Sequence, residues 1–225
     1  MTANVDCLVE KAAEILHEGD FEAALDGVDA EKRWRHRPYL KLHGCVGRDK
    51  DNTVWSKQQL TEDEIAERIQ SASQWLKVRL QHKTIVVIGF WTDWAYLNEI
   101  LADALVSIEP QRVIVVDPSD SATLEKKAPE LWKWAHSAKV SCDHLMEKGA
   151  EFLLALRAAY SRQFLKRIWK DAEKTFTDKF LSPPPAHPAL DPLTCEELYA
   201  LRQDVSGVLR TSAIRLKRPE RAMRL

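Results

Sequence analysis

The sequence of 225 residues has little net charge, no long hydrophobic run and no closely spaced cysteines. Its most apolar stretches, residues 85–88 and 113–116, are far shorter than the roughly 20 residues that cross a bilayer. The net charge of −1 gives no global reason to expect a nucleic acid or a membrane surface as partner. Met1 is not followed by a basic segment and an apolar core, so no signal peptide is indicated. The four cysteines form no Cys-x-x-Cys pair, which favours reduced thiols in a cytoplasmic protein.

Two runs of β-branched residues, 83–89 and 112–116, are typical of buried strands in a parallel sheet. The segment between them, from Trp94 to about residue 107, has a helical pattern, so the three elements form a βαβ unit. Further short strands are predicted at residues 53–56 and 138–141. The fold class is therefore α/β, with a Rossmann-like parallel sheet, helices on both of its faces and C-terminal helices.

Apolar residues at spacings of three or four predict the other helices. Their ranges are 7–18, 20–27, 61–80, two helices within 143–176, and 194–204. Polar residues that can cap a helix stand at four of the predicted starts. These residues are Asp20, Thr61, Asp93 and Thr194.

Two further short segments end in polar residues, where ligands of open α/β sheets bind. The first has the pattern Thr-x-Asn-Val-Asp, with Asn4 and Asp6, and the second is a strand at residues 38–42 followed by His43-Gly44. The order of these two motifs along the sequence, followed by strand ends at Gly89 and Asp117, resembles that of the sirtuin family and its bacterial NAD-cleaving relatives. The resemblance covers residues 1–160 and implies an NAD-binding domain of the deoxyhypusine-synthase-like type.

The resemblance implies that NAD is the substrate and that its bond between nicotinamide and ribose is cleaved. His43 would be the general base on a ribose hydroxyl, Asn4 would position the ribose or the attacking water, and Asp6 would help to hold the nicotinamide side. Further residues that would bind the dinucleotide are Thr2, Gly44, Gly89 and Asp117.

Structural roles are the alternatives for these residues. Asn4 and Asp6 can cap the helix that starts at Cys7, and His43 can be a buried histidine paired with a backbone carbonyl. Asp93 can contact a ribose, although a helix cap is the favoured role. A thiol dyad of His43 and Cys45 is disfavoured because no third orienting residue is evident.

The chain departs from zinc-containing deacylases of the sirtuin family. Between the His-Gly turn and the next buried strand it has only Cys45, and one thiolate cannot complete a tetrahedral zinc site. Ala3 stands where those deacylases place a glutamine. Both differences favour the zinc-free bacterial NAD glycohydrolases, many of which serve in phage defence, and no metal is expected.

The glycine-rich loop that holds the pyrophosphate in this family is absent. We therefore expect a preceding half domain upstream of Met1, because tight NAD binding by this chain alone is not expected without that loop. Whether this chain is an active glycohydrolase or an inactive truncated form stays open at this point. The alternative function is a non-catalytic interaction or regulatory module that keeps the sirtuin-like fold. In that case a second copy or the missing N-terminal half would cover the open sheet edge.

Composition suggests three parts: the partial sirtuin-like domain at 1–160, a helical extension at 161–181, and a proline-broken basic tail with a short helix at 182–225. Basic residues at 33–37 and in the tail offer contacts for a nucleic acid. Solvated segments are the favoured interpretation of both, so a nucleic acid is not expected as partner.

Overall fold

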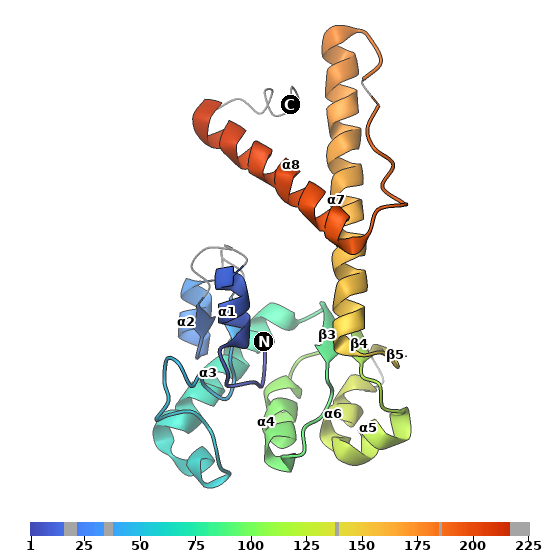
Figure 1. The fold of residues 1–225 in the computed structure, drawn as a ribbon. Helices are drawn as coiled ribbons and strands as arrows, with labels where there is room; N and C mark the ends of the chain where they lie inside the picture. Colours follow the sequence, from blue (N-terminus) through green and yellow to red (C-terminus); the bar gives the residue numbers. More distant parts are fainter. Residues whose placement is uncertain (16–21, 34–37, 138–139, 185, 217–225) are drawn as a thin grey trace. The chain divides into compact units, whose positions relative to one another are not determined.

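The computed structural model describes residues 1–15, 22–33, 38–137, 140–184 and 186–216, and the side chains of these up to residue 207 (Figure 1). The chain divides into two compact units, Met1–Glu147 and Lys148–Leu225. The boundary suggested by composition near residue 160 falls within one long helix of the second unit. No helix in the described ranges is long and apolar enough to cross a membrane.

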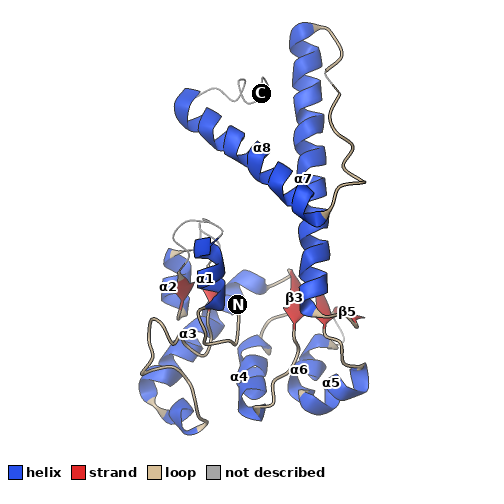
Figure 2. Ribbon diagram, viewed as in Figure 1, coloured by secondary structure: helices blue, strands red, loops and turns tan. Residues whose placement is uncertain are grey.

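The first unit contains a three-stranded parallel sheet in the order β3-β4-β5 (Figure 2). β3 (Thr84–Ile88) and β4 (Arg112–Val116) are the two predicted β-branched runs, and α4 (Ala95–Leu105) connects them. α5 (Ser121–Lys127) and α6 (Pro129–Ala135) lie between β4 and β5 (Ser141–Leu145). The α/β class and the βαβ unit are confirmed. The last strand begins three residues later than predicted, and residues 138 and 139 lie outside the described part.

A second, two-stranded parallel sheet pairs β1 (Ala23–Ala24) with β2 (Tyr39–Leu40). The N-terminal segment joins it through a parallel bridge between Thr2 and Lys41. The Thr2 N–H donates to the Leu40 carbonyl at 2.9 Å, and the Leu42 N–H donates to the Thr2 carbonyl at 3.2 Å. The two motifs of the sequence therefore lie side by side.

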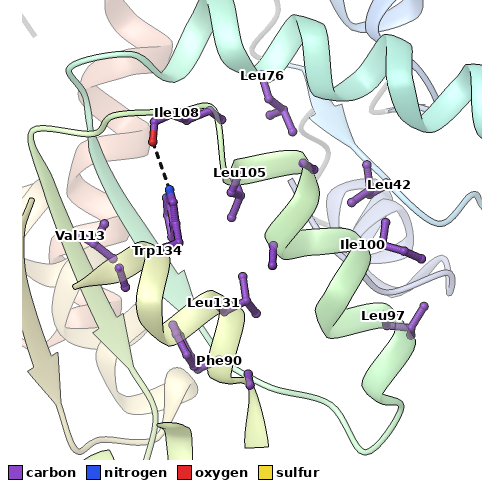
Figure 3. Packing of buried hydrophobic residues seen from close by; sticks show 14 of the residues in the cluster. Leu42, Leu76, Phe90, Leu97, Ile100, Leu105, Ile108, Val113, Leu131 and Trp134 are labelled. Atoms are coloured by element: carbon purple, nitrogen blue, oxygen red, sulfur yellow. Dashed lines mark hydrogen bonds between the residues drawn. The ribbon is translucent and has the colours of Figure 1, made fainter. Parts of the chain in front are cut away.

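One hydrophobic core joins both sheets to the helices around them (Figure 3). Leu42 packs with α4 residues such as Ile100, while Val113 and Val115 of β4 contribute from the larger sheet. Trp134 of α6 closes the cluster by donating from its indole N–H to the Ile108 carbonyl at 3.1 Å. This core fixes the position of the His43 turn relative to the larger sheet.

β3 is less buried than its apolar run predicts. Ile85 and Val87 pack on the core, but Val86 and Ile88 are 42% and 40% exposed on the other face. Leu145 of β5 is also exposed. Within the first unit, the structure therefore shows apolar packing on one face of β3 and exposed apolar side chains on its other face.

Near the N-terminus, α1 (Leu8–Ile15) is confirmed, but the predicted helix at 20–27 is wrong. Residues 23 and 24 form β1 instead, and α2 (Gly27–Lys32) starts after Asp26. The Asp26 carboxylate accepts the Asp29 N–H at 2.7 Å and is the true cap. Asp20, the predicted cap, lies outside the described residues, as do residues 16–18 of the predicted first helix and residues 34–37 of the basic segment.

α3 (Asp63–Leu80) is confirmed, but the cap expected from Thr61 is wrong. Thr61 ends a 3₁₀ helix, η2 (Gln58–Thr61), and its hydroxyl donates to the Gln58 carbonyl at 2.8 Å. Glu62 is the N-cap residue of α3 and makes no side-chain cap bond. The strand expected at residues 53–56 does not form, although the Val54 N–H donates to the His43 carbonyl at 2.9 Å.

Asp93 does not cap α4, because Trp94 occupies the N-cap position and the Asp93 side chain is 83% exposed. The buried Asn98 holds the preceding turn instead. Its side chain accepts the Thr92 N–H at 2.9 Å and donates to the Thr92 carbonyl at 3.0 Å. An amide can satisfy the N–H and the carbonyl of one residue at once, which an ionised carboxylate cannot.

The second unit is a pair of helices. α7 (Gly149–Phe180) is one helix of 32 residues where we predicted two. It ends with Leu181 in a left-handed conformation just before the prolines, as predicted for this stop. α8 (Cys195–Leu216) begins at the predicted cap Thr194 and runs further than expected. Leu165, Leu190 and Leu198 form the small core of this unit.

Candidate functional site

Asn4 and Asp6 lie in the bend that follows the strand-like Thr2. The Asn4 N–H donates to the Thr2 hydroxyl at 3.1 Å, and the Asn4 residue is exposed. The Asp6 carboxylate accepts the Leu8 N–H at 2.9 Å at the start of α1. Asp6 therefore caps the helix, whereas the exposed Asn4 is open to a ligand.

His43 is 1% exposed and lies at the end of the strand that pairs with residue 2. Its Nδ1 is 3.0 Å from the carbonyl oxygen of Ala3, in the same segment as Asn4. Its Nε2 is buried and has no hydrogen-bond partner in the described part of the chain. Burial lowers the pKa of His43, and the charge of Arg68 lowers it further, although the bond to Ala3 opposes them. A neutral ring that donates from Nδ1 leaves the lone pair of Nε2 free to accept a proton.

Gly44 allows the chain to turn directly after His43. Its φ is +92°, a conformation that L side chains rarely adopt. A Cβ at this position would lie 3.0 Å from the Thr53 Cα, which is too close for an ordinary contact. The glycine of the His-Gly motif is therefore required by backbone geometry at the turn itself.

Arg68 of α3 is a residue of this region that the sequence analysis missed. Its side chain is 9% exposed, and it donates from Nη1 to the Asn52 carbonyl at 2.7 Å and to the Asp49 carboxylate at 3.3 Å. Burial lowers the pKa of Arg68, although Asp49 opposes the shift. Its Nε and Nη2 have no partner in the ranges that the structure describes. Its spacing from Ile65 and Ala72 places it on the buried face of the helix, and that signal was available in the sequence.

The carboxyl ends of the larger sheet bring Gly89 and Asp117 together. Gly89 has a φ of +71° and open space around its Cα, and its N–H donates to the Val116 carbonyl at 3.0 Å. The Asp117 carboxylate accepts the N–H of Phe90 at 3.0 Å and of Ser119 at 2.9 Å. Asp117 is 6% exposed. Its carboxylate therefore holds the backbone at both strand ends and offers little surface for direct contact with a ligand.

His144 extends this edge and was not singled out from the sequence. Its Nε2 is 3.2 Å from the Asp117 carbonyl oxygen, and its Nδ1 is 3.2 Å from the Ser121 hydroxyl. These contacts place two further polar side chains at the ends of β4 and β5. Their positions follow from the strand register, which the sequence alone did not provide.

The structure also brings together side chains that the sequence separates. Cys7, Glu10 and Cys45 each offer one ligand atom, and these atoms lie within 4.8 Å of one another. The Lys41 ammonium group lies among them, 2.6 Å from the Glu10 carboxylate and 3.2 Å from the Cys45 sulfur. Cys45 therefore pairs with Lys41 and Cys7, not with His43 as in the disfavoured dyad.

Comparison with known families shows to which family the chain belongs. The model of the SIR2-like domain matches residues 1–139, which include both motifs and most of the larger sheet. The chain belongs to the SIR2-like domain family. No curated protein and no solved structure matched the sequence.

The resemblance to sirtuins and the Rossmann-like α/β fold are thereby confirmed. SIR2-like domains generally bind NAD. The turn of this SIR2-like domain suits such a ligand, because the buried Nε2 of His43 has no partner among the residues that the structure describes and Gly44 keeps the adjacent backbone free of a side chain.

Proposed function

We propose that this SIR2-like domain is an NAD glycohydrolase of the zinc-free bacterial type, which transfers the ADP-ribosyl group of NAD to water. The observation that carries the proposal is the buried Nε2 of His43, which is unpartnered among the described residues and adjoins the exposed Asn4 segment. The role in phage defence and the cytoplasmic location are part of the same proposal.

The chemistry needs a base more than it needs a strong nucleophile. The positively charged nicotinamide ring is a good leaving group, and its departure produces an oxocarbenium-like ribose. His43 would accept a proton from a ribose hydroxyl through Nε2, and because burial lowers its pKa the ring is neutral and able to act as a base at neutral pH. Asn4 would orient the ribose or the attacking water. Hydrolysis by water does not require a binding site for an acyl group.

The dinucleotide would extend from the His43 turn toward the carboxyl ends of the larger sheet. Thr2 and Gly44 lie on the first side, and Gly89 and Asp117 lie on the second. Gly89 offers open space, so a ribose can approach its backbone closely. Asp117 would act through the turns that it holds, because both backbone N–H groups on its carboxylate are already fixed.

The test separates hydrolysis from acyl transfer. The purified 225-residue chain is incubated with NAD alone and with NAD plus an acetyl-lysine peptide, and the products are separated by chromatography. We expect nicotinamide and ADP-ribose in equal amounts, with no effect of the peptide. Loss of the acetyl group from the peptide would contradict the glycohydrolase assignment. No product from NAD, in a protein that is folded by circular dichroism, would contradict catalysis by this chain.

The exposed apolar face of β3 favours a second candidate function. Val86, Ile88 and Leu145 leave apolar surface on one side of the larger sheet, and such surface commonly marks an interaction site. A non-catalytic module that pairs with a second copy, or with an N-terminal half domain, would cover it. Size-exclusion chromatography with light scattering discriminates: a dimer that lacks NAD turnover supports the module, and a strict monomer at high concentration counts against it.

A further inference from the structure

Two thiols from distant parts of the first unit are in contact. The sulfur atoms of Cys7 and Cys45 are 3.7 Å apart, although the residues are 38 positions apart in the sequence. Cys7 is partly exposed, whereas Cys45 is 1% exposed beneath it. Both are reduced in the structure, and they are the only cysteine pair described in contact.

A buried cation lies beside the inner thiol. The Lys41 side chain is fully buried, and its ammonium group is 3.2 Å from the Cys45 sulfur and also donates to the Asp6 carbonyl. Burial by itself raises the pKa of the Cys45 thiol, but hydrogen bonds from the Gly47 N–H, Lys41 and Cys7 bring the pKa below its usual value. Burial and the neighbouring Cys45 raise the pKa of Cys7. The two thiols thus differ: Cys45 is the more acidic of the pair and forms the reactive thiolate more readily than Cys7 does.

The loop after Cys45 packs closely against the thiol of Cys7, the more exposed of the two cysteines. A Cβ on Gly47 would lie 2.7 Å from the Cys7 sulfur, so a larger residue would displace the thiol from its neighbour. The backbone of this loop is held to Cys45, whose carbonyl accepts the N–H of Asp49 at 2.8 Å. The contact between the thiols therefore depends on a fitted loop, not on two side chains that meet by chance on the surface.

We propose that Cys7 and Cys45 form an oxidant-sensitive dithiol, which a hydroperoxide converts into a disulfide. The Cys45 thiolate attacks the peroxide, so that a sulfur–oxygen bond forms and the oxygen–oxygen bond breaks; the leaving oxygen takes a proton from solvent. The Cys7 sulfur then attacks the sulfur of the Cys45 sulfenic acid. The sulfur–sulfur bond forms, and the hydroxide that leaves takes the Cys7 proton and departs as water. The two thiols supply the two electrons that reduce the peroxide.

A metal site is the competing interpretation of these residues, and Lys41 argues against it. A bound cation would have to displace a fully buried ammonium group from the Glu10 carboxylate, 2.6 Å away, and leave that charge without compensation. Oxidation needs no such displacement.

The disulfide would connect the segment of Asn4 and Asp6 to the turn of His43 and Gly44. Closing a loop of this length restricts the unfolded chain, so we expect oxidation to raise the Tm by about 5–15 °C. An effect on NAD turnover rests on the proposed function, whereas the thiol chemistry does not.

The experiment follows the thiols of the full chain directly. The reduced protein is treated with one equivalent of hydrogen peroxide, free thiols are alkylated, and the peptides are mapped by mass spectrometry without reduction. We expect a cross-linked peptide of Cys7 and Cys45 and alkylated Cys142 and Cys195. In Cys7→Ser, dimedone should label Cys45 as a sulfenic acid, and in the matched control Cys142→Ser the cross-link should form as in the wild type.

Three results would overturn the proposal. The first is that both thiols are alkylated after peroxide to the same extent as Cys142. The second is that dimedone labels Cys45 equally in the wild type and in Cys7→Ser, since Cys7 would then not resolve the sulfenic acid. The third is stoichiometric zinc in the reduced protein that blocks alkylation of both thiols, which would establish a metal site.

Discussion

At His43 the two ring nitrogens have different surroundings, and this difference determines the chemistry available to the ring. Nδ1 is fixed by the carbonyl oxygen of Ala3 at 3.0 Å, while Nε2 is buried without a partner in the described residues. Ala3 is 40 positions away in the sequence. The sequence suggested both a general base and a carbonyl-paired buried histidine. The structure shows that pairing, and within the described ranges no group bonds to the other nitrogen.

The lowered pKa of His43 predicts a dependence of stability on pH. An unfolded histidine has a pKa of about 6.5, and burial and the charge of Arg68 lower the folded value below it. The unfolded state therefore binds more protons as the pH falls through about 6.5, and the free energy of unfolding decreases. Above that pH both states hold a neutral ring and the contribution vanishes.

His43→Gln removes this titration while keeping a polar side chain of similar length. We expect the wild type to lose more stability than the variant between about pH 7.5 and pH 5.5, as measured by urea unfolding. The buried Arg68 is present in both proteins, so it does not account for a difference. Equal losses would show that His43 is not held neutral by burial.

Gly44 and Gly89 form a matched pair of glycines with positive φ in the same unit. Alanine at Gly89 meets open space, so we expect only the backbone cost of about 1–2 kcal/mol. Alanine at Gly44 adds a Cβ contact at 3.0 Å from the Thr53 Cα, so the loss should be larger, about 2–4 kcal/mol. Urea unfolding of both variants measures the difference, and equal losses would show that the turn relaxes without strain.

At the scale of elements, one sequence pattern gave two outcomes. A threonine followed three positions later by glutamate occurs at Thr61 and at Thr194. At Thr194 the box forms, because Glu197 accepts the Thr194 N–H at 2.8 Å and the Glu197 N–H donates to the Thr194 hydroxyl at 3.3 Å. At Thr61 it does not, because Gln59 accepts the N–H groups of Trp55 and Ser56 and holds the segment in a 3₁₀ turn.

The capping box at Thr194 predicts a local loss of stability on substitution. Thr194→Ala should destabilise the first turn of α8 by about 1 kcal/mol, which amounts to about fivefold faster amide exchange there. Thr175→Ala, within α7, is the control: its hydroxyl donates to the Asp171 carbonyl one turn earlier, and alanine favours a helix interior. Hydrogen exchange measures both variants. Unchanged exchange in Thr194→Ala would show that the box contributes nothing.

At the scale of the whole molecule, the sequence predicted the elements that local pattern determines. The β-branched runs gave β3 and β4, and apolar spacing gave α3 and α4. It did not predict β1, because Ala23 and Ala24 become a strand only through pairing with β2. The contacts of Cys7 with Cys45 and of His144 with Asp117 likewise depend on which strand ends meet, and no local pattern specifies that.

If this SIR2-like domain uses His43 to cleave NAD, as proposed, nicotinamide release depends on that side chain, and its rate is the most direct test. His43→Ala is compared with the wild type and with His136→Ala, an exposed histidine of the same unit that bonds to the Trp132 carbonyl. We expect His136→Ala to retain the wild-type rate and His43→Ala to lose at least about a hundredfold, as for a general base. Unchanged turnover in a folded His43→Ala protein would contradict the account.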